Sequence, residues 1–349
     1  AGCAAALRLP EARVHTALFE AGKILGGRAR AVEVPGHQLD NGQHILLGAY
    51  AQTLNLIAKL HPRDANPADA ALLRTSLALE QPPDFALVCP RLPAPFQLFV
   101  GLWGARGLSF FDKLAASRWV RSVLDGRENS VDTSVAQLIA NQPKRVRAYL
   151  WEPLCIAALN TQPDQASAKI FKHVLAASFG ELRSHSDLLF PRLDLTRLFP
   201  APAAQRILEL KGEIHLQTRI KTLRVDRQKV TLSMSGSTVD FDRVIVAVAP
   251  QHLTGICAEI PELKDVCRMV ESYRYEVIAT VYLQYPHDVR LSRPMLALNG
   301  GPAQYVFDRG YTHSHPGLLA CVISAASSLL GYPQAEWLLQ IQQQLSHIF

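Results

Sequence analysis

A glycine and an acidic residue near the start of the chain have the types and spacing that bind phosphate and ribose. Gly2 opens an alanine-rich segment, and Glu20 follows 18 residues later, at the end of the alternating run RVHTALFE. In dinucleotide-binding units a helix N-terminus binds the diphosphate, and an acid about 20 residues after the glycines binds ribose hydroxyls. The first two glycines of the G-x-G-x-x-G motif are absent, so Gly2 can only be the third. The alternative is an ordinary helix with a surface glutamate.

A second phosphate-binding feature is the run Gly26-Gly27-Arg28, six residues after Glu20. A glycine pair frees backbone N–H groups for a close approach to phosphate, and an arginine binds phosphate through two N–H groups at once. The alternative is a plain glycine turn with a solvated arginine. The position after the acidic strand favours diphosphate binding.

The elements around these residues predict an α/β fold. Residues 1–9 (AGCAAALRL) read as a helix and residues 13–20 as a strand, so we expect the unit's first strand to be missing from the chain. The run DRVIVAVAP has the continuous apolar pattern of a strand buried on both faces. Gly212 is a candidate C-terminal cap for a helix over 202–210. Further helices are expected at 49–60, 110–124, 135–159, 165–179 and 335–349, and further strands at 213–225, 230–234, 239–248, 275–285 and 317–325.

Composition restricts the class of protein. The length of 349 residues favours two domains, and 48% hydrophobic residues suit a large core, an apolar cavity or a membrane-facing patch. The net charge of +6 comes from scattered basic residues without a long run, which argues against a nucleic-acid partner. The six cysteines form no CxxC pair or zinc-type cluster, so we expect reduced, buried thiols and no metal.

The segment FEAGKILGGRAR, residues 19–30, resembles the flavin amine oxidase and phytoene desaturase superfamily. The resemblance implies that Gly2, Glu20, Gly26, Gly27 and Arg28 bind FAD rather than NAD. It also implies a Rossmann-like FAD-binding domain that carries an inserted substrate-binding domain. We expect the first at residues 1–62 and 205–255, and the second at 63–204 and 256–349.

Four further segments resemble one family within that superfamily, the hydroxysqualene dehydroxylases or squalene-associated FAD-dependent desaturases. The most specific is WEPLCIAALNT at 151–161, because the wider superfamily does not share it. The others are LDNGQHILLGAY at 39–50, SDLLFPRLDLTRLFPAPA at 186–203 and YVFDRG at 305–310. The family's C-terminal flavin segment, a Gly-Asp followed by a helix, is not in the sequence, so we expect a chain truncated at both ends.

The resemblance places the loop from Asp40 to His44 beside the isoalloxazine ring. Gly42 and Gln43 would then contact the cofactor, and His44 is the first candidate for the catalytic acid, with Asp40 the second. The alternative is an Asx turn in which His44 only satisfies backbone carbonyls.

The remaining candidates follow from the same resemblance. Ile220 matches a backbone contact on the adenine side, and Ala247 and Pro250 close the strand that re-enters the FAD domain, unless they are simple core residues. Trp151 and Asn160 are candidates for lining the substrate tunnel, with a structural hydrogen bond as the alternative for Asn160. Asp308 and Arg309 are expected to form an internal ion pair.

The implied activity is reductive removal of the hydroxyl of hydroxysqualene to give squalene, in squalene and hopanoid biosynthesis. Rival interpretations are a carotenoid desaturase, an amine oxidase, and a non-catalytic isoprenoid carrier of the same fold. The oily stretch 92–111 is too short in its uncharged part to span a bilayer. Its aromatic residues are either a membrane-dipping rim or buried core. We expect a cytoplasmic protein with peripheral membrane contact.

Overall fold

The computed structural model describes residues 1–9, 14–62, 71–124 and 131–349. The chain divides into two compact units. Unit 1 consists of Ala1–Asn41, Leu56–Arg63 and Leu193–Tyr275, and unit 2 consists of Gly42–Asn55, Asp64–Arg192 and Glu276–Phe349. Helix α2 (Ala51–Leu60) crosses from one unit to the other. Relative to the expected domains, unit 1 excludes 42–55 and takes in 193–204 and 256–275.

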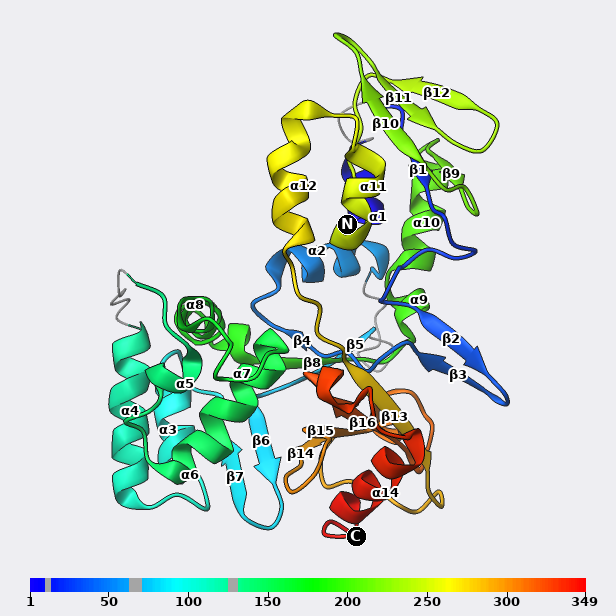
Figure 1. The fold of residues 1–349 in the computed structure, drawn as a ribbon. Helices are drawn as coiled ribbons and strands as arrows, with labels where there is room; N and C mark the ends of the chain where they lie inside the picture. The colour runs from blue at the N-terminus through cyan, green and yellow to red at the C-terminus, as the bar shows by residue number, and fades with distance from the viewer. Residues whose placement is uncertain (10–13, 63–70, 125–130) are drawn as a thin grey trace. The chain divides into compact units, whose positions relative to one another are not determined.

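Unit 1 combines a parallel strand pair, an antiparallel meander, a hairpin and several helices (Figure 1). Its elements are α1 (Gly2–Arg8), β1 (Ala17–Phe19), β2 (Ala31–Val34), β3 (His37–Asp40), α9 (Leu195–Leu198), α10 (Pro200–Glu209), β9 (Glu213–His215), β10 (Thr222–Val225), β11 (Val230–Ser233), β12 (Thr238–Phe241), α11 (Leu253–Cys257) and α12 (Lys264–Glu271), with 3-10 turns at Pro250–His252 and Pro261–Leu263.

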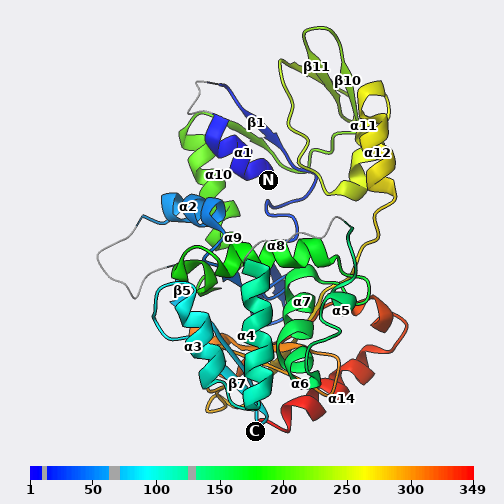
Figure 2. The ribbon, with the colours of Figure 1, turned by 90° about the vertical axis from the view of Figure 1, so that its left-hand side faces the viewer.

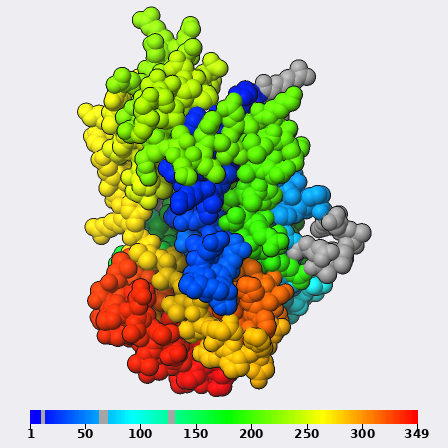
Figure 3. Space-filling view, turned by 90° about the vertical axis from the view of Figure 1, so that its right-hand side faces the viewer, coloured from blue at the N-terminus to red at the C-terminus, as the bar shows by residue number. Residues whose placement is uncertain are grey.

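The parallel pair β1–β9 has the strand direction of a Rossmann-type sheet. Its register aligns Leu18 with Ile214, and these two side chains pack with Ala6 and Leu7 of α1 and Ile207 of α10. The blue N-terminal segment and the green segment that pairs with it lie together on the face seen in Figure 3. Parallel strands with helices packed on them are the α/β arrangement that the sequence predicts.

The segment 243–249 differs from its expected structure. Strand β12 ends at Phe241, and within the described part of the chain no strand pairs with the residues that follow. Ile245 and Val248 are exposed, whereas a strand covered on both faces would bury them. An apolar run marks a stretch that can be buried, but it becomes a strand only where a neighbour completes the hydrogen-bond ladder.

The end of α10 also differs from expectation. Lys211, and not Gly212, has the left-handed backbone conformation, with φ of +62°. Gly212 is needed for space, since a Cβ there would lie 2.7 Å from Cγ2 of Ile207 and 2.8 Å from Oγ1 of Thr16. Gly212 still takes part in the cap, because its N–H donates to the Ile207 carbonyl at 2.9 Å while Lys211 N–H donates to that of Leu208, as in a Schellman motif.

Unit 2 has a four-stranded antiparallel sheet with a helical layer beside it. Its elements are β4 (Leu46–Leu47), β5 (Leu72–Thr75), β6 (Ala78–Gln81), β7 (Phe85–Val88), α3 (Phe96–Gly104), α4 (Phe110–Leu124), α5 (Val135–Leu138), α6 (Lys144–Val146), α7 (Glu152–Leu159), α8 (Ala168–Phe179), β8 (Leu188–Pro191), β13 (Ala279–Gln284), β14 (Met295–Ala297), β15 (Tyr305–Asp308), α13 (Arg309–Thr312), β16 (Leu318–Ile323) and α14 (Gln334–Leu345), with a π turn at Arg147–Trp151 and 3-10 turns at Arg183–Ser186 and Ala326–Leu329.

The main sheet of unit 2 has the order β13-β16-β15-β14 and buries both faces. On β16, Cys321 points into the core shared with α14, and Val322 points into the larger core shared with the helical layer. This alternation is the period of two that strands require. The helical layer contains the segment 135–159, which is divided into α5, α6, the π turn and α7 instead of forming one helix.

The cysteines agree with the sequence. All six are free thiols, and all but Cys3 are buried. Burial raises the pKa of Cys89 to about 12 and that of Cys155 to about 11, so neither is a reactive thiolate at neutral pH. In the described residues, no helix combines the length and apolar character needed to cross a bilayer.

Candidate functional site

The N-terminus of α1 has the close packing that a dinucleotide-binding helix requires. A Cβ on Gly2 would lie 3.2 Å from Cδ1 of Leu18 and 3.5 Å from Cβ of Ala247. Gly2 thus lets α1 approach both β1 and the segment after β12, which is the role of the third glycine in the dinucleotide motif. Ala247 is beside it, although the segment is not a strand here, and Pro250 is the first residue of a 3-10 turn.

Glu20 follows β1 and is held in place by backbone groups. Its Oε1 accepts a hydrogen bond from the N–H of Gly22 at 2.7 Å, and its own N–H donates to the carbonyl of His215 on β9. Burial, with a smaller contribution from the Glu20 carboxylate, raises the pKa of the Cys3 thiol in α1. The Glu20 side chain is thus oriented by the backbone of the turn that follows β1, which is the position of the ribose-binding acid in dinucleotide-binding units.

The twin glycines form a tight turn. Gly26 has φ of +114° and Gly27 has φ of +57°, and the N–H of Ala29 donates to the Gly26 carbonyl at 3.0 Å. A Cβ on Gly26 would lie 2.7 Å from the Ala29 carbonyl oxygen, whereas a Cβ on Gly27 would have open space around it. Arg28 is exposed, and its carbonyl accepts a hydrogen bond from the Asn41 side chain.

Ile220 lies just before β10 and packs into the core of the meander. It is part of the same unit as Gly2 and Glu20. Together, the helix start, the oriented carboxylate and the glycine turn fit the adenosine diphosphate half of a flavin cofactor. A diphosphate would be held by the α1 N-terminus and Arg28, and a ribose by Glu20.

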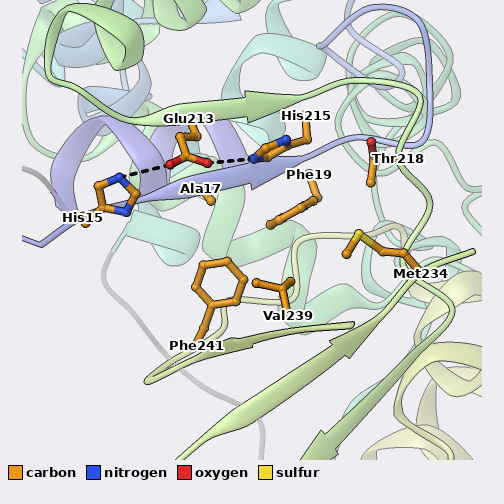
Figure 4. Close-up of a pocket in the computed structure, with 9 residues that line it drawn as sticks. All are labelled: His15, Ala17, Phe19, Glu213, His215, Thr218, Met234, Val239 and Phe241. Carbon is orange, nitrogen blue, oxygen red and sulfur yellow. Dashed lines mark hydrogen bonds and ion pairs between the residues drawn. The ribbon is translucent and has the colours of Figure 1, made fainter. Parts of the chain in front are cut away.

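A cavity of about 330 Å³ in unit 1 lies next to Glu20, because its lining includes Phe19 and also Thr218, whose N–H donates to the Glu20 carbonyl (Figure 4). It opens between the β1–β9 pair and the meander, and its wall includes Phe19 stacked on His215 at 4.7 Å. Glu213 accepts a hydrogen bond from Nε2 of His215 at 3.0 Å, and its other carboxylate oxygen lies 3.4 Å from Nε2 of His15. None of the residues expected to bind the cofactor lines the cavity, so we assign it no role in cofactor binding.

In unit 2, the loop 42–44 is held by side chains from distant parts of the chain. The Gln43 N–H donates to Oγ1 of Thr280 on β13 at 3.3 Å, and Gln43 Oε1 accepts from Nη1 of Arg309 at 2.9 Å. Arg309 is 1% exposed, and its guanidinium lies over the Tyr282 ring, 5.9 Å from the centroid. A buried cation with a carbonyl acceptor and an aromatic face is a rigid support.

The hydrogen bond of His44 determines what its ring can do. Nδ1 lies 2.9 Å from the carbonyl oxygen of Gly42, so it carries a proton and donates. Nε2 is then the nitrogen that exchanges a proton with an external group. His44 is exposed, so a bound substrate can reach it. Gly42 has φ of +132°, which gives the loop the turn that brings its carbonyl to the ring.

Asp40 has a structural partner. It is 3% exposed, and its Oδ1 accepts a hydrogen bond from the N–H of Leu195, the first residue of α9, at 2.7 Å. An acid at a helix N-terminus satisfies a free N–H group and interacts favourably with the helix dipole. This geometry favours a positioning role for Asp40 over proton transfer, and the catalytic assignment stays a prediction.

The two residues expected in the substrate tunnel both have structural partners. Trp151 is buried in the π turn, donates from Nε1 to Gln142 and packs on Trp119 at 4.4 Å. Asn160 ends α7 in the left-handed conformation, and its Oδ1 accepts from the N–H of Ala325 at 2.7 Å. These contacts favour the structural alternative, and a substrate contact stays a prediction for both.

Thr280, Tyr282 and Arg309 complete the loop's environment, and the sequence did not point to the first two. Arg309 was expected to pair with Asp308. Instead, the ion-pair partner of Asp308 is Arg290 at 3.8 Å, and Asp308 also accepts the N–H groups of Leu291 and Gly310. One feature of the sequence could have pointed to Arg309: it directly follows Asp308, the last residue of a strand that is otherwise apolar.

Comparison with known proteins agrees with this geometry. Over 360 aligned residues the chain is 22% identical to hydroxysqualene dehydroxylase of Zymomonas mobilis, covering 100% of this chain and 80% of that protein. It is 25% identical to the chloroplast 15-cis-phytoene desaturase of Arabidopsis thaliana, covering 77% of this chain and 50% of that protein. The crystal structure of an oxidoreductase from Methanosarcina mazei superimposes with a TM-score of 0.71 at 16% identity, covering 99% of this chain and 82% of that one.

The model of the flavin containing amine oxidoreductases matches residues 1–349. The structural superposition shows that the two proteins share a mixed α/β fold. The chain therefore belongs to the flavin containing amine oxidoreductase family, and it is an oxidoreductase whose cofactor is FAD.

Proposed function

We propose that this oxidoreductase removes the hydroxyl of hydroxysqualene reductively and releases squalene, as a step of squalene and hopanoid biosynthesis. The similarity to the Zymomonas enzyme, which runs over the whole chain, and the segment WEPLCIAALNT support this substrate. The structural observation that carries the proposal is the loop 42–44, which holds His44 with a protonated Nδ1 and an available Nε2.

The reaction needs one proton and one hydride. The proton joins the substrate hydroxyl, the C–O bond breaks with loss of water, and the hydride forms the new C–H bond. Reduced FAD supplies that hydride when it is bound. The protein must supply the proton, align the reacting carbon and exclude water.

His44 is the proposed proton donor. With Nδ1 donating to the Gly42 carbonyl, an imidazolium can release its second proton only from Nε2. Gln43 fixes the loop through Arg309 and Thr280, which keeps this nitrogen in one place. Asp40 is a weaker candidate, because its carboxylate already accepts the N–H of Leu195.

The similarity to the Zymomonas enzyme supports a thirty-carbon isoprenoid as the substrate. Such a substrate gains about 0.8 kcal/mol for each CH₂ that leaves water, so it needs a comparably apolar binding surface. A cytoplasmic location with peripheral membrane contact would give the enzyme access to such a lipid.

Two other functions remain as alternatives. The similarity to phytoene desaturase favours a carotenoid desaturase, in which the hydride moves from substrate to flavin. A non-catalytic isoprenoid carrier needs no cofactor, and the packed Gly2, the oriented Glu20 and the tight turn at Gly26 argue against it.

Product analysis with the FAD-loaded protein tests the proposal. Incubation with hydroxysqualene and reduced FAD should give squalene, and incubation with phytoene and oxidised FAD should leave phytoene unchanged. If the substrate hydroxyl is labelled with ¹⁸O, the label should appear in the released water. Desaturated phytoene without squalene would replace the proposal by the desaturase, and a protein without flavin absorbance would favour the carrier.

A further inference from the structure

We propose that α3 and the start of α4 form a docking surface for an anionic lipid bilayer. The aromatic surface, as we call it, consists of Phe96, Val100, Trp103, Phe110 and Phe111. The inference deepens the proposed function, because a lipid substrate must be taken from a membrane. Figure 2 shows both helices at the front of unit 2.

The aromatic surface exposes an unusual amount of apolar side chain. Phe96 is 63% exposed, Phe110 60% and Phe111 77%. Phe96, Val100 and Trp103 recur at the spacing of one helix face, and the rings of Trp103, Phe110 and Phe111 form a chain of edge contacts. A contiguous apolar patch of this kind marks an interaction site in a water-soluble protein.

The exposure results from a fixed orientation of α3. The opposite side of the helix buries Gln97, Gly101 and Leu102 against β7 and the chain that follows it. A Cβ on Gly101 would lie 2.8 Å from Sγ of Cys89, so the helix is already as close to that surface as a glycine allows. A rotation that hid Phe96 and Trp103 would have to bring a side chain into this contact.

Basic residues surround the aromatic surface. Nζ of Lys113 donates to the Trp103 carbonyl at 2.8 Å, and Arg145 donates to the Gly107 carbonyl at 3.3 Å in the connection between the helices. From residue 85 to residue 124 the only acid is Asp112, whose buried carboxylate accepts the N–H and O–H of Ser109. Over the same range the basic residues are Arg91, Arg106, Lys113, Arg118 and Arg121.

This combination selects the partner. The exposed Asp84 lies beside Gly107, so basic residues outnumber acids here without being the sole charges. Exposed phenylalanine and tryptophan beside a majority of lysine and arginine is the composition of interfacial membrane anchors, in which rings enter the acyl boundary and cations contact anionic headgroups. A symmetric second copy would bring the same cations face to face, and their repulsion opposes it. The bilayer is therefore the occupant that matches both the apolar and the charged part.

Vesicle co-sedimentation of the FAD-loaded protein tests the proposal. We expect binding to vesicles of phosphatidylcholine with phosphatidylglycerol, weaker binding to phosphatidylcholine alone, and partial release at about 0.5 M salt, where headgroup charges are screened. The variant Phe110→Ser/Phe111→Ser should lower the partition coefficient about tenfold or more. The control is Leu339→Ser, because Leu339 is a 57% exposed apolar residue on α14 of the same unit, and this variant should bind vesicles like the parent.

A second variant separates the charged contribution. Arg118→Gln/Arg121→Gln should reduce binding to the anionic vesicles and leave binding to phosphatidylcholine unchanged. The proposal is overturned if the parent protein sediments with neither vesicle, or if the phenylalanine variant binds as the parent does. It is also overturned if sedimentation velocity shows a dimer that this variant dissociates. An activity assay with detergent-solubilised hydroxysqualene is independent of docking, so the two proposals can fail separately.

Discussion

The flavin-binding features of unit 1 and the loop 42–44 of unit 2 are built in different ways. In unit 1 the side-chain hydrogen bonds near the site are local, such as Glu20 with Gly22 and Arg30 with Gly27, and the longer-range contacts, such as Glu20 N–H with the His215 carbonyl, are made by the backbone. In unit 2 the contacts of Gln43 join residues 237 and 266 positions apart. The first region is a backbone structure that glycines make possible, and the second is a side-chain structure that depends on tertiary packing.

The difference determines how each region should respond to substitution. A backbone site tolerates changes of most side chains but not an added Cβ where the chain is tight or φ is positive. A side-chain site depends on the identity of a few buried groups, because a buried polar group without its partner costs about 1–3 kcal/mol. Substitutions in the two regions should therefore change different measurements.

The largest expected effect is on catalysis in unit 2. The variant His44→Asn keeps a donor to the Gly42 carbonyl but has no transferable proton, so kcat should fall about 100- to 10,000-fold. Flavin absorbance and thermal stability should stay close to those of the parent, which identifies the loss as chemical. A kcat within about threefold of the parent would remove His44 as the acid and redirect attention to Asp40.

The next effect is on cofactor binding in unit 1. The variant Gly26→Ala places a Cβ 2.7 Å from the Ala29 carbonyl oxygen, at a residue with φ of +114°. This contact strains the turn by about 1–3 kcal/mol, and the turn must deform to relieve it. FAD affinity, measured by flavin fluorescence titration, should weaken about 10- to 100-fold.

Gly27→Ala is the matched control for this substitution. Its φ is also positive, but a Cβ there meets no atom within 4 Å, so the effect on FAD affinity should be several-fold smaller. Equal FAD affinities for the two variants would show that a Cβ at residue 26 does not strain the turn.

The same division explains what could be predicted from the sequence. The acid after β1, the glycine turn and helix α4 at 110–124 all depend on local spacing and periodicity, and the structure contains them where they were expected. The resemblance of short segments was sufficient to predict the flavin amine oxidase superfamily and its cofactor.

Features that depend on tertiary contacts could not be derived in this way. No spacing rule connects Gln43 with Arg309, and the role of Gly212 depends on the distance to Ile207 and Thr16 after folding. The apolar run 243–249 shows the same limit, because hydrophobicity does not determine whether a strand has a neighbour. The roles of Trp151 and Asn160 likewise depend on the partners that folding brings to them.

A smaller effect is expected from the support of the loop. Arg309→Lys keeps a positive charge but loses the planar fork that reaches Gln43 and covers Tyr282, so we expect a loss of about 1–2 kcal/mol in the free energy of unfolding. The value of kcat should fall about tenfold.

A double-mutant cycle shows whether Arg309 acts through the loop. If it positions His44, then adding Arg309→Lys to His44→Asn should cause little further loss of kcat. Losses that simply multiply would mean that the arginine stabilises unit 2 without positioning the loop. In that case the side-chain contacts of the loop 42–44 would contribute to the stability of unit 2 and not to catalysis.

The smallest expected effect is on the pH dependence of the free energy of unfolding, which depends on the buried thiols of the two units. Burial raises the pKa of Cys89 and of Cys321 in unit 2 to about 12, above the ordinary value of 9.0. Between these values the unfolded chain loses thiol protons that the folded chain keeps, so the stability that these thiols contribute is complete below pH 9 and decreases as the pH rises toward 12. At pH 10 the loss is about 1 kcal/mol for each thiol.

Urea unfolding at pH 8 and pH 10 measures this loss, with Cys321→Ala as the comparison. The variant is less stable at both pH values because it leaves a cavity, but its decrease between them should be smaller than that of the parent by about 1 kcal/mol. Cys3, which is only partly buried in unit 1, provides the control, since Cys3→Ala should change the decrease less. Equal decreases for the parent and Cys321→Ala would mean that the core of unit 2 opens to solvent before the molecule unfolds.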